Sequence, residues 1–228
     1  MITFPIGFYK GASGGSFENV YSIDFDGVDD YVDISAISGV SDPATISFWL
    51  NPTSVGILYG GLFSSENYFQ SPNTNTFSIQ LSGNKIRYVG YNNGSFDAFQ
   101  YNGYTAAVGT WAHIALTLSG TTLKLYIDGS LADTYTITSG GTWANLSNGA
   151  YIGKDRLTEA AAIIDEVSIF DAELSASDIF LTGHSNLQGW WRMGDGATFP
   201  TIPDDSSNSN DGTMTNMVAG DIVADVPT

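Results

Sequence analysis

Apolar and polar positions alternate with a period of two along much of the chain, which is the pattern of β-strands with one buried face. Residues 21–34 begin in this way, because Ile23 and Phe25 are separated by polar residues. Asp26 and Gly27 follow, and glycine readily adopts the positive φ that a tight reversal needs. The stretch is therefore predicted to form a strand, a turn and the start of a second strand.

The same alternation recurs at short intervals. Further strands are predicted over residues 44–50, 57–63, 77–81, 85–91, 112–118, 123–127, 131–137, 150–153, 163–170 and 189–193. Glycine, serine and asparagine between them are typical turn residues, and residues 92–108 and 204–212 are predicted to be loops. One short helix is predicted within residues 171–180, since Ser175 precedes Asp178 by the spacing of a capping box.

Strands that alternate in this way must bury their apolar faces against one another. The chain is therefore predicted to be all-β, with two antiparallel sheets packed face to face and one short helix. Residues 1–17, which are apolar and then rich in glycine and serine, are expected to form a tail or linker that acts as a docking arm. We expect the sandwich to occupy residues 18–213 and a C-terminal tail to occupy residues 214–228.

The composition narrows the range of partners. The 228 residues include 7 Lys and Arg against 24 Asp and Glu, a formal net charge of -17. Such a charge repels phosphate backbones and anionic headgroups, so neither nucleic acid nor a membrane is an expected partner. Cysteine is absent, which excludes disulfides and thiolate metal sites. We also expect no signal peptide and no transmembrane segment, since no apolar run approaches the ~20 residues that a membrane helix needs.

Five motifs occur in the order and spacing of a known family. They are FDGVDDYVDI (25–34), ATISFWLNPTS (44–54), GTWAHIALTLSGTTLKLYIDGSLADT (109–134), AYIGKDR (150–156) and IIDEVSIFDAELSASDI (163–179). Over residues 21–179 the chain resembles laminin-G-like domains of the concanavalin A-like lectin/glucanase superfamily. The resemblance implies a jelly-roll sandwich of two curved antiparallel sheets, a calcium ion at its rim, and a non-catalytic role in binding carbohydrate or protein.

The C-terminal part departs from the usual order of that family. Residues 189–213 resemble the family's opening motif, an aromatic strand followed by an acidic loop, although they lie near the end of the chain. A permuted strand over residues 187–193 would complete the laminin-G-like domain of residues 18–213. The alternative is that this segment is the stub of a second repeat.

The C-terminal sequence WWRMGDGATFPTIPDDSS also resembles that of laminin-G-like proteins of marine tailed phages, which are virion surface proteins. The resemblance implies a location on the virion surface, as a capsid decoration, spike or tail fibre component that takes part in host attachment. The implied partners are other virion proteins, or copies of the same chain in a homo-oligomer, and a cell-surface glycan.

Four aspartates are the candidate metal ligands. Asp26, Asp29 and Asp30 lie close together in the sequence without a basic neighbour. Asp165 is predicted to share an apolar face with Ile163 and with the residues at 167 and 169, where a carboxylate must be neutralised or hydrogen-bonded. Backbone amides or a loop are one interpretation of its partner. The other is a calcium ion shared with the three aspartates, since Ca²⁺ takes six to eight oxygen ligands.

Aromatic residues in or near predicted loops are the candidate ligand contacts. They are Tyr91, Phe96, Tyr101, Tyr104 and Trp143. Rings of this kind stack on the apolar faces of sugars, and neighbouring amides bond the sugar hydroxyls. The same rings would equally suit packing beneath loops or a contact between subunits.

Catalysis is not expected. Glucanases of this superfamily place two carboxylates across a cleft, whereas Asp165 and Glu166 are adjacent and would point to opposite faces of a strand. The chain also lacks the E-x-D-x-E strand of those enzymes. We therefore expect a non-enzymatic virion surface protein that is structural and adhesive to host glycans. A bacterial carbohydrate-binding module and a polysaccharide hydrolase are the alternatives.

Overall fold

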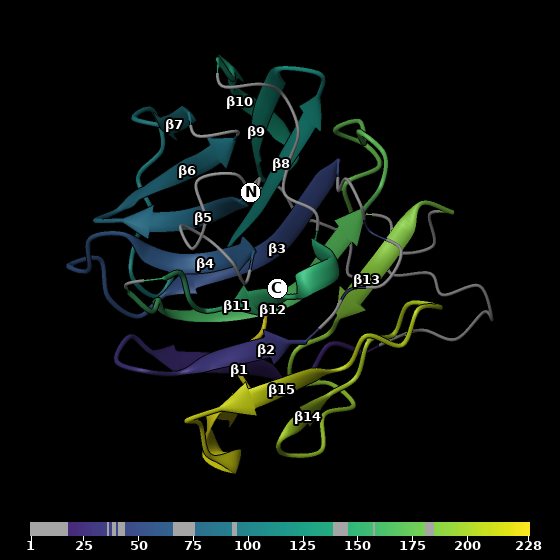
Figure 1. Ribbon diagram of the computed structural model, residues 1–228. Coiled ribbons are helices and arrows are strands. Elements are labelled where there is room, and N and C mark those ends of the chain that lie inside the picture. The colour runs from purple at the N-terminus through teal and green to yellow at the C-terminus, as the bar shows by residue number, and fades with distance from the viewer. Residues whose placement is uncertain are drawn as a thin grey trace.

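The computed structural model is a sandwich of two antiparallel β-sheets, as the sequence pattern predicts (Figure 1). The structure describes residues 18–35, 37, 40, 44–65, 76–92, 95–138, 146–156, 158–180 and 185–228. The expected arm at residues 1–17 lies outside this part of the chain. No helix in the described part is long and apolar enough to cross a membrane.

The first sheet has eight strands within the described residues. They are hydrogen-bonded in the order β10, β9, β8, β3, β12, β1 and β16, and β13 also pairs with β12. Their bounds are Ser22–Asp26 for β1, Thr45–Pro52 for β3, Ala112–Ser119 for β8, Thr122–Ile127 for β9, Ser130–Thr136 for β10, Ala161–Phe170 for β12, Leu187–Trp191 for β13 and Ile222–Val223 for β16.

The second sheet also has eight strands in the described part of the chain, in the order β14, β15, β2, β11, β4, β5, β6 and β7. Their bounds are Tyr31–Ile34 for β2, Gly60–Ser65 for β4, Thr76–Ser82 for β5, Lys85–Asn92 for β6, Ser95–Gln100 for β7, Ala150–Ile152 for β11, Thr201–Ile202 for β14 and Gly212–Thr215 for β15. Two 3-10 turns, η1 at Leu146–Asn148 and η2 at Ala219–Asp221, are the helical structure of the described residues.

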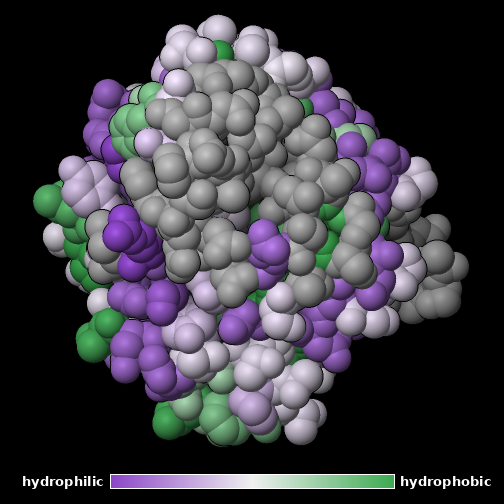
Figure 2. Space-filling model, in the orientation of Figure 1, coloured by the Kyte–Doolittle hydropathy of each residue, from purple (hydrophilic) through white to green (hydrophobic). Residues whose placement is uncertain are grey.

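The core lies between the two sheets. Phe25, Phe48, Phe63, Phe77 and Trp191 are among its largest fully buried side chains. Each such burial stabilises the fold by roughly 1.5–3 kcal/mol, because apolar surface leaves water. On the visible surface the apolar residues of the described part occur in separate patches among hydrophilic ones (Figure 2).

The C-terminal aromatic strand is part of this sandwich. β13 pairs antiparallel with β12, and Trp191 on β13 is fully buried in the common core. Its indole Nε1 donates to the carbonyl of Asn210 at 2.9 Å, which ties β13 to the acidic loop that follows. β13 is therefore a strand of the first sheet, bonded to the loop that follows it.

The short helix predicted within residues 171–180 does not form. The chain makes a single turn there, in which the amides of Asp178 and Ile179 donate to the Ser175 carbonyl at 2.9 and 3.1 Å. The Ser175 hydroxyl donates to the Asp178 carboxylate at 2.6 Å, so the two side chains of the predicted capping box pair with each other instead of with backbone amides. Leu174 and Ile179 are nevertheless buried, as expected.

The loop predicted over residues 92–108 contains a strand, β7. Its apolar pattern is reversed, since Phe96 points outward and is half exposed while Asp97 is buried. The Asp97 carboxylate accepts hydrogen bonds from the Tyr135 hydroxyl at 3.1 Å and from the Thr138 amide and hydroxyl at 3.1 and 2.9 Å. This internal satisfaction of a carboxylate explains why alternation did not reveal the strand.

The tail predicted over residues 214–228 is instead attached to both sheets. Met214 and Thr215 belong to β15, and β16 pairs with β1. Beyond β16 the Asp225 carboxylate accepts hydrogen bonds from the Trp111 indole at 3.0 Å and from the Asn51 amide at 3.3 Å. The sandwich therefore extends past residue 213.

A β-bulge in β12 changes which of its side chains share a face. The register of β12 against β3 shifts between Asp165 and Ser168, and Glu166 has a φ of 50°. Ile164 before the bulge and Val167 after it both belong to the core, so the alternation reverses between them. The prediction that Asp165 shares its face with Val167 is therefore wrong, and Asp165 lies on the outer face of the first sheet.

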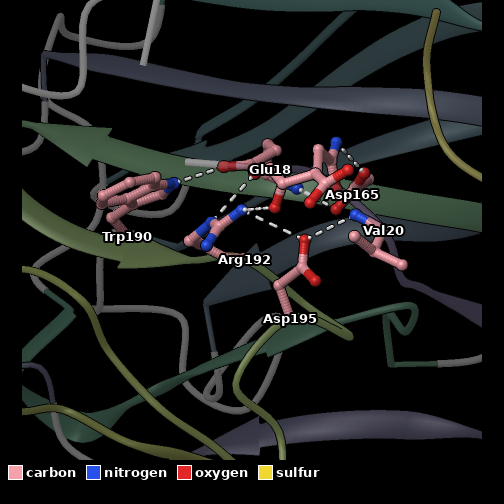
Figure 3. A network of polar contacts seen from close by, with 8 residues as sticks. Glu18, Val20, Asp165, Trp190, Arg192 and Asp195 are labelled. Atoms are coloured by element: carbon pink, nitrogen blue, oxygen red, sulfur yellow. Dashed lines mark hydrogen bonds and ion pairs between the residues drawn. The ribbon is translucent and has the colours of Figure 1, made fainter. Parts of the chain in front are cut away.

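Asp165 and Glu166 are buried on that outer face, and groups from two distant segments satisfy them (Figure 3). Asn19 Nδ2 donates to Asp165 Oδ2 at 2.8 Å, and the amide of Glu166 donates to Asp165 Oδ1 at 2.9 Å. The Glu166 carboxylate accepts from the Trp190 indole and, at 3.2 Å, from Arg192 Nε. Asp165 is thus partnered by a loop side chain and a backbone amide.

Arg192 joins these groups to the segment that precedes β1 (Figure 3). Its Nη2 donates to Asp195 Oδ2 at 3.1 Å and to the carbonyl of Glu18 at 3.0 Å. Asp195 Oδ2 also accepts the amide of Val20 at 3.0 Å. The chain before β1 and the chain after β13 are therefore bound to each other over the outer face of β12.

Both carboxyls of β12 hold a proton more strongly than they would in water. Burial, followed by the charge of Glu166, raises the pKa of Asp165 well above its ordinary value. Burial also raises the pKa of Glu166, although the Arg192 charge acts in the opposite direction. The folded state therefore binds protons that the unfolded chain has already released, and this contribution to stability is lost as the pH rises through the raised pKa values.

We expect the melting temperature to fall between about pH 5 and about pH 8, because unfolded carboxyls have pKa values near ~4. Asp165→Asn imitates the protonated side chain, so it should reduce this fall by on the order of 1 kcal/mol of unfolding free energy or more. Thermal denaturation at both pH values measures the effect, and Asp171→Asn, at an exposed position, is the control. An undiminished pH dependence in Asp165→Asn would contradict the assignment.

Candidate functional site

The turn between β1 and β2 gathers three carboxylates. Oxygen atoms of Asp26, Asp29 and Asp30 lie within 4.8 Å of one another. Gly27 allows the turn with a φ of 76°, and Asp26 Oδ1 accepts the amides of Val28 at 2.7 Å and Asp29 at 3.4 Å. Asp30 Oδ2 accepts the amide of Asp26 at 3.2 Å. The backbone of the turn thus aims three acidic side chains at one place.

The surroundings of this turn disfavour the negative charges on its carboxyl groups. Burial raises the pKa of Asp30 to about 6, and the charges of Asp26, Asp221 and Asp29 act in the same direction against the hydrogen bond from the Asp26 amide. Burial, with Asp221 next, also raises the pKa of Asp24. Hard oxygen ligands at this spacing fit a calcium ion, which would bring the positive charge that the turn lacks.

Asp165 does not belong to this group. Asp26 pairs with Ala161 across the β1–β12 ladder, and Asp165 lies four positions farther along β12. Four positions of a strand correspond to about 13 Å. The structure therefore brings together three of the four predicted metal ligands and places Asp165 in the hydrogen-bonded network of Figure 3.

The outer face of the second sheet carries the other candidate residues. The inner face of this sheet contributes Val32, Phe63, Ile79 and Tyr88 to the core. The side chains that alternate with these residues along each strand therefore point outward. By this alternation and the strand register, the outer face includes Tyr31, Asp33, Ser64, Thr76, Ser78, Gln80, Arg87, Val89, Tyr91, Phe96 and Tyr151. The side chains of this face that are exposed or half-buried are Tyr31, Asp33, Arg87, Tyr91, Phe96 and Tyr151, whereas Ser64, Thr76, Ser78, Gln80 and Val89 are buried.

Tyr91 and Phe96 are cross-strand partners on this outer face. Phe96 is 50% exposed and Tyr91 is half-buried. On its other side Tyr91 pairs with Thr76, whose buried hydroxyl has no hydrogen-bond partner among the described residues, and the same holds for Ser78. Both hydroxyls are closed to solvent, so a ligand at the surface would meet the Tyr91 and Phe96 rings and not these two groups.

A hydrogen-bonded chain fixes the polar part of the same face. Gln80 Nε2 donates to Asp155 Oδ2 at 2.6 Å, and Arg87 Nη1 donates to Gln80 Oε1 at 2.7 Å. The Arg87 guanidinium lies over the Tyr59 ring at 4.8 Å. Asp155 is held in turn by the Thr158 amide at 2.9 Å. Gln80 and Arg87 are therefore oriented before any ligand arrives.

A second group of rings lies toward β2 and β11. Tyr31 and Tyr151 meet edge to face with their centroids 5.3 Å apart. Lys154 Nζ lies 3.9 Å from the Tyr31 ring centroid and 3.7 Å from Glu159 Oε1. Sequence reasoning missed these two tyrosines, although alternation about Val32 would have placed Tyr31 on the polar face.

The remaining predicted contacts have other environments. Tyr101 and Tyr104 are packed against the core, and burial raises the pKa of Tyr104 to about 12. Both rings are half-buried, so part of each still faces solvent. Trp143 lies outside the described residues. His113 is buried, and burial lowers its pKa to about 3, so its ring is neutral at ordinary pH.

Comparison with known proteins identifies the family to which this fold belongs. A laminin G family model described as the concanavalin A-like lectin/glucanases superfamily matches residues 26–180. No curated relative matches the chain.

Several solved structures share the fold. A Bacteroides ovatus protein provisionally assigned to carbohydrate binding superposes with a TM-score of 0.66 at 13% identity, over 88% of this chain and 59% of that one. The SAP-like pentraxin of Limulus polyphemus gives 0.53 at 14%, over 74% of this chain and 83% of that one. The CBM40 of a Ruminococcus gnavus sialidase, bound to α2,3 sialyllactose, gives 0.51 at 16%, over 70% and 94%.

The family model covers more than half of the chain, and the two-sheet sandwich is the fold that these structures share. The chain therefore belongs to the concanavalin A-like lectin/glucanase superfamily, with a laminin G domain over residues 26–180.

Proposed function

We propose that this chain is a non-enzymatic carbohydrate-binding module that holds a glycan on the outer face of its second sheet. The observation that carries the proposal is the exposed ring of Phe96 beside the half-buried ring of Tyr91. Sugars offer apolar ring faces together with hydroxyls. A few convergent polar groups among aromatic side chains are what orient such a ligand.

The similar structures support this proposal. The Ruminococcus gnavus module is bound to a sialylated sugar, and the Bacteroides ovatus protein is assigned to carbohydrate binding. Because this chain spans 59% of the Bacteroides ovatus chain, the comparison supports a binding role for the sandwich and leaves the rest of that protein aside.

The buried carboxylates argue against a hydrolase. A glycosidase needs two carboxyl groups that flank the substrate. Asp165 and Glu166 are 0% and 2% exposed, and their oxygens accept hydrogen bonds from Asn19, Trp190 and Arg192. They also lie on the first sheet, whereas the aromatic surface lies on the second.

We further propose that the module is displayed on a tailed phage particle, as a decoration, spike or fibre component beside other virion proteins or copies of itself. The C-terminal sequence resemblance and the net charge of -17 support this location. Mass spectrometry of gradient-purified particles is expected to detect the chain at a fixed ratio to the capsid protein. Its presence only in the unassembled fraction of the lysate would contradict the location and leave the glycan proposal standing.

Removal of either outer ring is expected to weaken glycan binding. Tyr91→Ala and Phe96→Ala should each lower the affinity roughly tenfold, since stacking on an aromatic ring contributes about 1 kcal/mol or more. A glycan array followed by titration calorimetry measures the loss. Leu131→Ala, at a residue 55% exposed on β10 of the other sheet, is the control. Unchanged affinity in both ring variants would show that the glycan does not bind to this face.

A calcium ion at Asp26, Asp29 and Asp30 is part of the same proposal. Millimolar calcium should raise the melting temperature and excess chelator should return it, because a ligand at about 100 times its Kd stabilises the folded state by about 2.7 kcal/mol. Asp29→Asn should abolish the calcium response, whereas Asp171→Asn should keep it. Equal melting curves with calcium and with chelator would eliminate the site.

A further inference from the structure

The β15–β2–β11 end of the second sheet has an outer face that solvent can reach. These three strands are neighbours in the sheet (Figure 1). Because their inner positions belong to the core, the alternate side chains point outward, and these include Tyr31, Asp33, Tyr151 and Thr213. Thr213 is exposed, and the other three are half-buried. This end of the sheet therefore differs from its centre, where the outward side chains are buried.

Asp33 lies in the middle of this open surface. It is the cross-strand partner of Tyr151 on one side and of Thr213 on the other. Its carboxylate accepts no hydrogen bond from the residues that the structure describes, and burial raises its pKa while the charge of Lys154 acts in the opposite direction. The carboxylate has thus lost part of its hydration without a hydrogen-bond donor from the protein, which is unfavourable unless a ligand supplies one.

Two tyrosine rings lie beside this carboxylate. Tyr151 is directly opposite Asp33, and Tyr31 is two positions away from Asp33 on the same face of β2. The two rings meet edge to face with their centroids 5.3 Å apart, so each restricts the motion of the other. The surface therefore combines fixed apolar rings with an acceptor that needs donors, and a sugar unit offers C–H groups and hydroxyls together.

The charges around this surface favour a neutral ligand. Lys154 Nζ lies 3.9 Å from the centroid of the Tyr31 ring and 3.7 Å from Glu159 Oε1. The position over this ring that would attract a cationic ligand is therefore already occupied by a cation. An anionic ligand would meet the Asp33 carboxylate and a chain with a net charge of -17. A neutral ligand that donates hydroxyl groups avoids both repulsions.

We propose that Asp33, with the Tyr31–Tyr151 ring pair, forms a second glycan contact that binds a neutral sugar unit. Hydroxyl groups of the sugar donate to the Asp33 carboxylate, and its C–H groups pack against the rings. This inference rests on the proposed function and adds a site toward the opposite end of the same sheet from Tyr91 and Phe96. Hydrogen bonds to an ionised acceptor are roughly twice as strong as neutral ones, so Asp33 contributes most of the selectivity for hydroxyls.

The two contacts are separate from each other. Tyr151 pairs with Ser64, and Ser64 pairs with Ser78, and both serines are fully buried. The β11 strand that carries Tyr151 lies three strands from β6, which carries Tyr91, a distance of about 14 Å. One sugar unit therefore contacts one site, and a branched or repetitive glycan that reaches both gains affinity through effective concentration.

An NMR titration of the full chain with lactose, cellotriose, xylotriose, maltotriose and sialyllactose tests the second contact. At least one neutral sugar should shift the backbone amide signals of Asp33, Tyr151 and Thr213. Asp33→Asn should weaken binding at these amides roughly tenfold, because a neutral amide replaces a charged acceptor. The affinity at Tyr91 and Phe96 should not change.

The matched control is Asp133→Asn, at a half-buried aspartate on β10 of the other sheet, which should leave both sites unchanged. Its carboxylate accepts the Thr134 amide at 2.7 Å, so it is satisfied within the protein. Melting curves of both variants separate a loss of binding from a loss of fold. The titration of the unaltered chain keeps the test decisive if Asp33→Asn does not fold.

The possible results distinguish this inference from the proposed function. Shifts confined to Tyr91 and Phe96, or binding at Asp33 that Asp33→Asn leaves unchanged, overturn the second contact alone. Tighter binding of sialyllactose than of lactose at the Asp33 amides overturns the neutral ligand class. Shifts confined to Asp33, Tyr151 and Thr213 support the second contact and remove the site at Tyr91 and Phe96. Binding of no sugar overturns both.

Discussion

The structure depends on the complete burial of β12. All ten residues of Ala161–Phe170 are buried, although the sandwich core covers only one face of the strand. The outer face therefore needs separate cover. Leu174 and Ile179 pack against Phe170 at one end. Toward the middle of β12, cover comes from the chain before β1 and the chain after β13 (Figure 3). A central strand of this kind cannot remain buried unless segments distant in sequence fold back over it.

The segments that cover the middle of β12 contact it mainly through polar groups, and this restricts how those segments can be arranged. Two adjacent carboxylates are stable in a buried position only when each has partners, since an unpartnered buried charge costs several kcal/mol. Arg192, Trp190 and Asn19 provide those partners from both covering segments. The network therefore couples the two segments, and weakening of one of them exposes the charge that the other helps to satisfy.

Alternation along the strands and the order of the motifs predicted the two sheets, because the apolar face of one sheet must pack against the apolar face of another. The turn at Gly27 was predictable as well, since glycine itself allows the positive φ found there. Alternation and motif order failed where tertiary contacts override the local pattern. Asp97 is buried inward and satisfied by β10 and its following residues, which disguised β7 as a loop. The bulge at Glu166 reverses alternation with a non-glycine residue at positive φ, which no sequence signal marks. Arg87 was missed because a strand pattern gives the face of a side chain and not its partners.

The candidate binding rings lie on β6 and β7, at one end of the second sheet. Residues 18–20, 171–180 and 190–195 occupy much of the outer face of the first sheet, and their hydrogen bonds leave few groups there for a ligand. On the outer face of the second sheet the central residues Ser64, Ser78 and Gln80 are buried too, and access to solvent at the β6–β7 end is kept by the exposed ring of Phe96 and the half-buried ring of Tyr91.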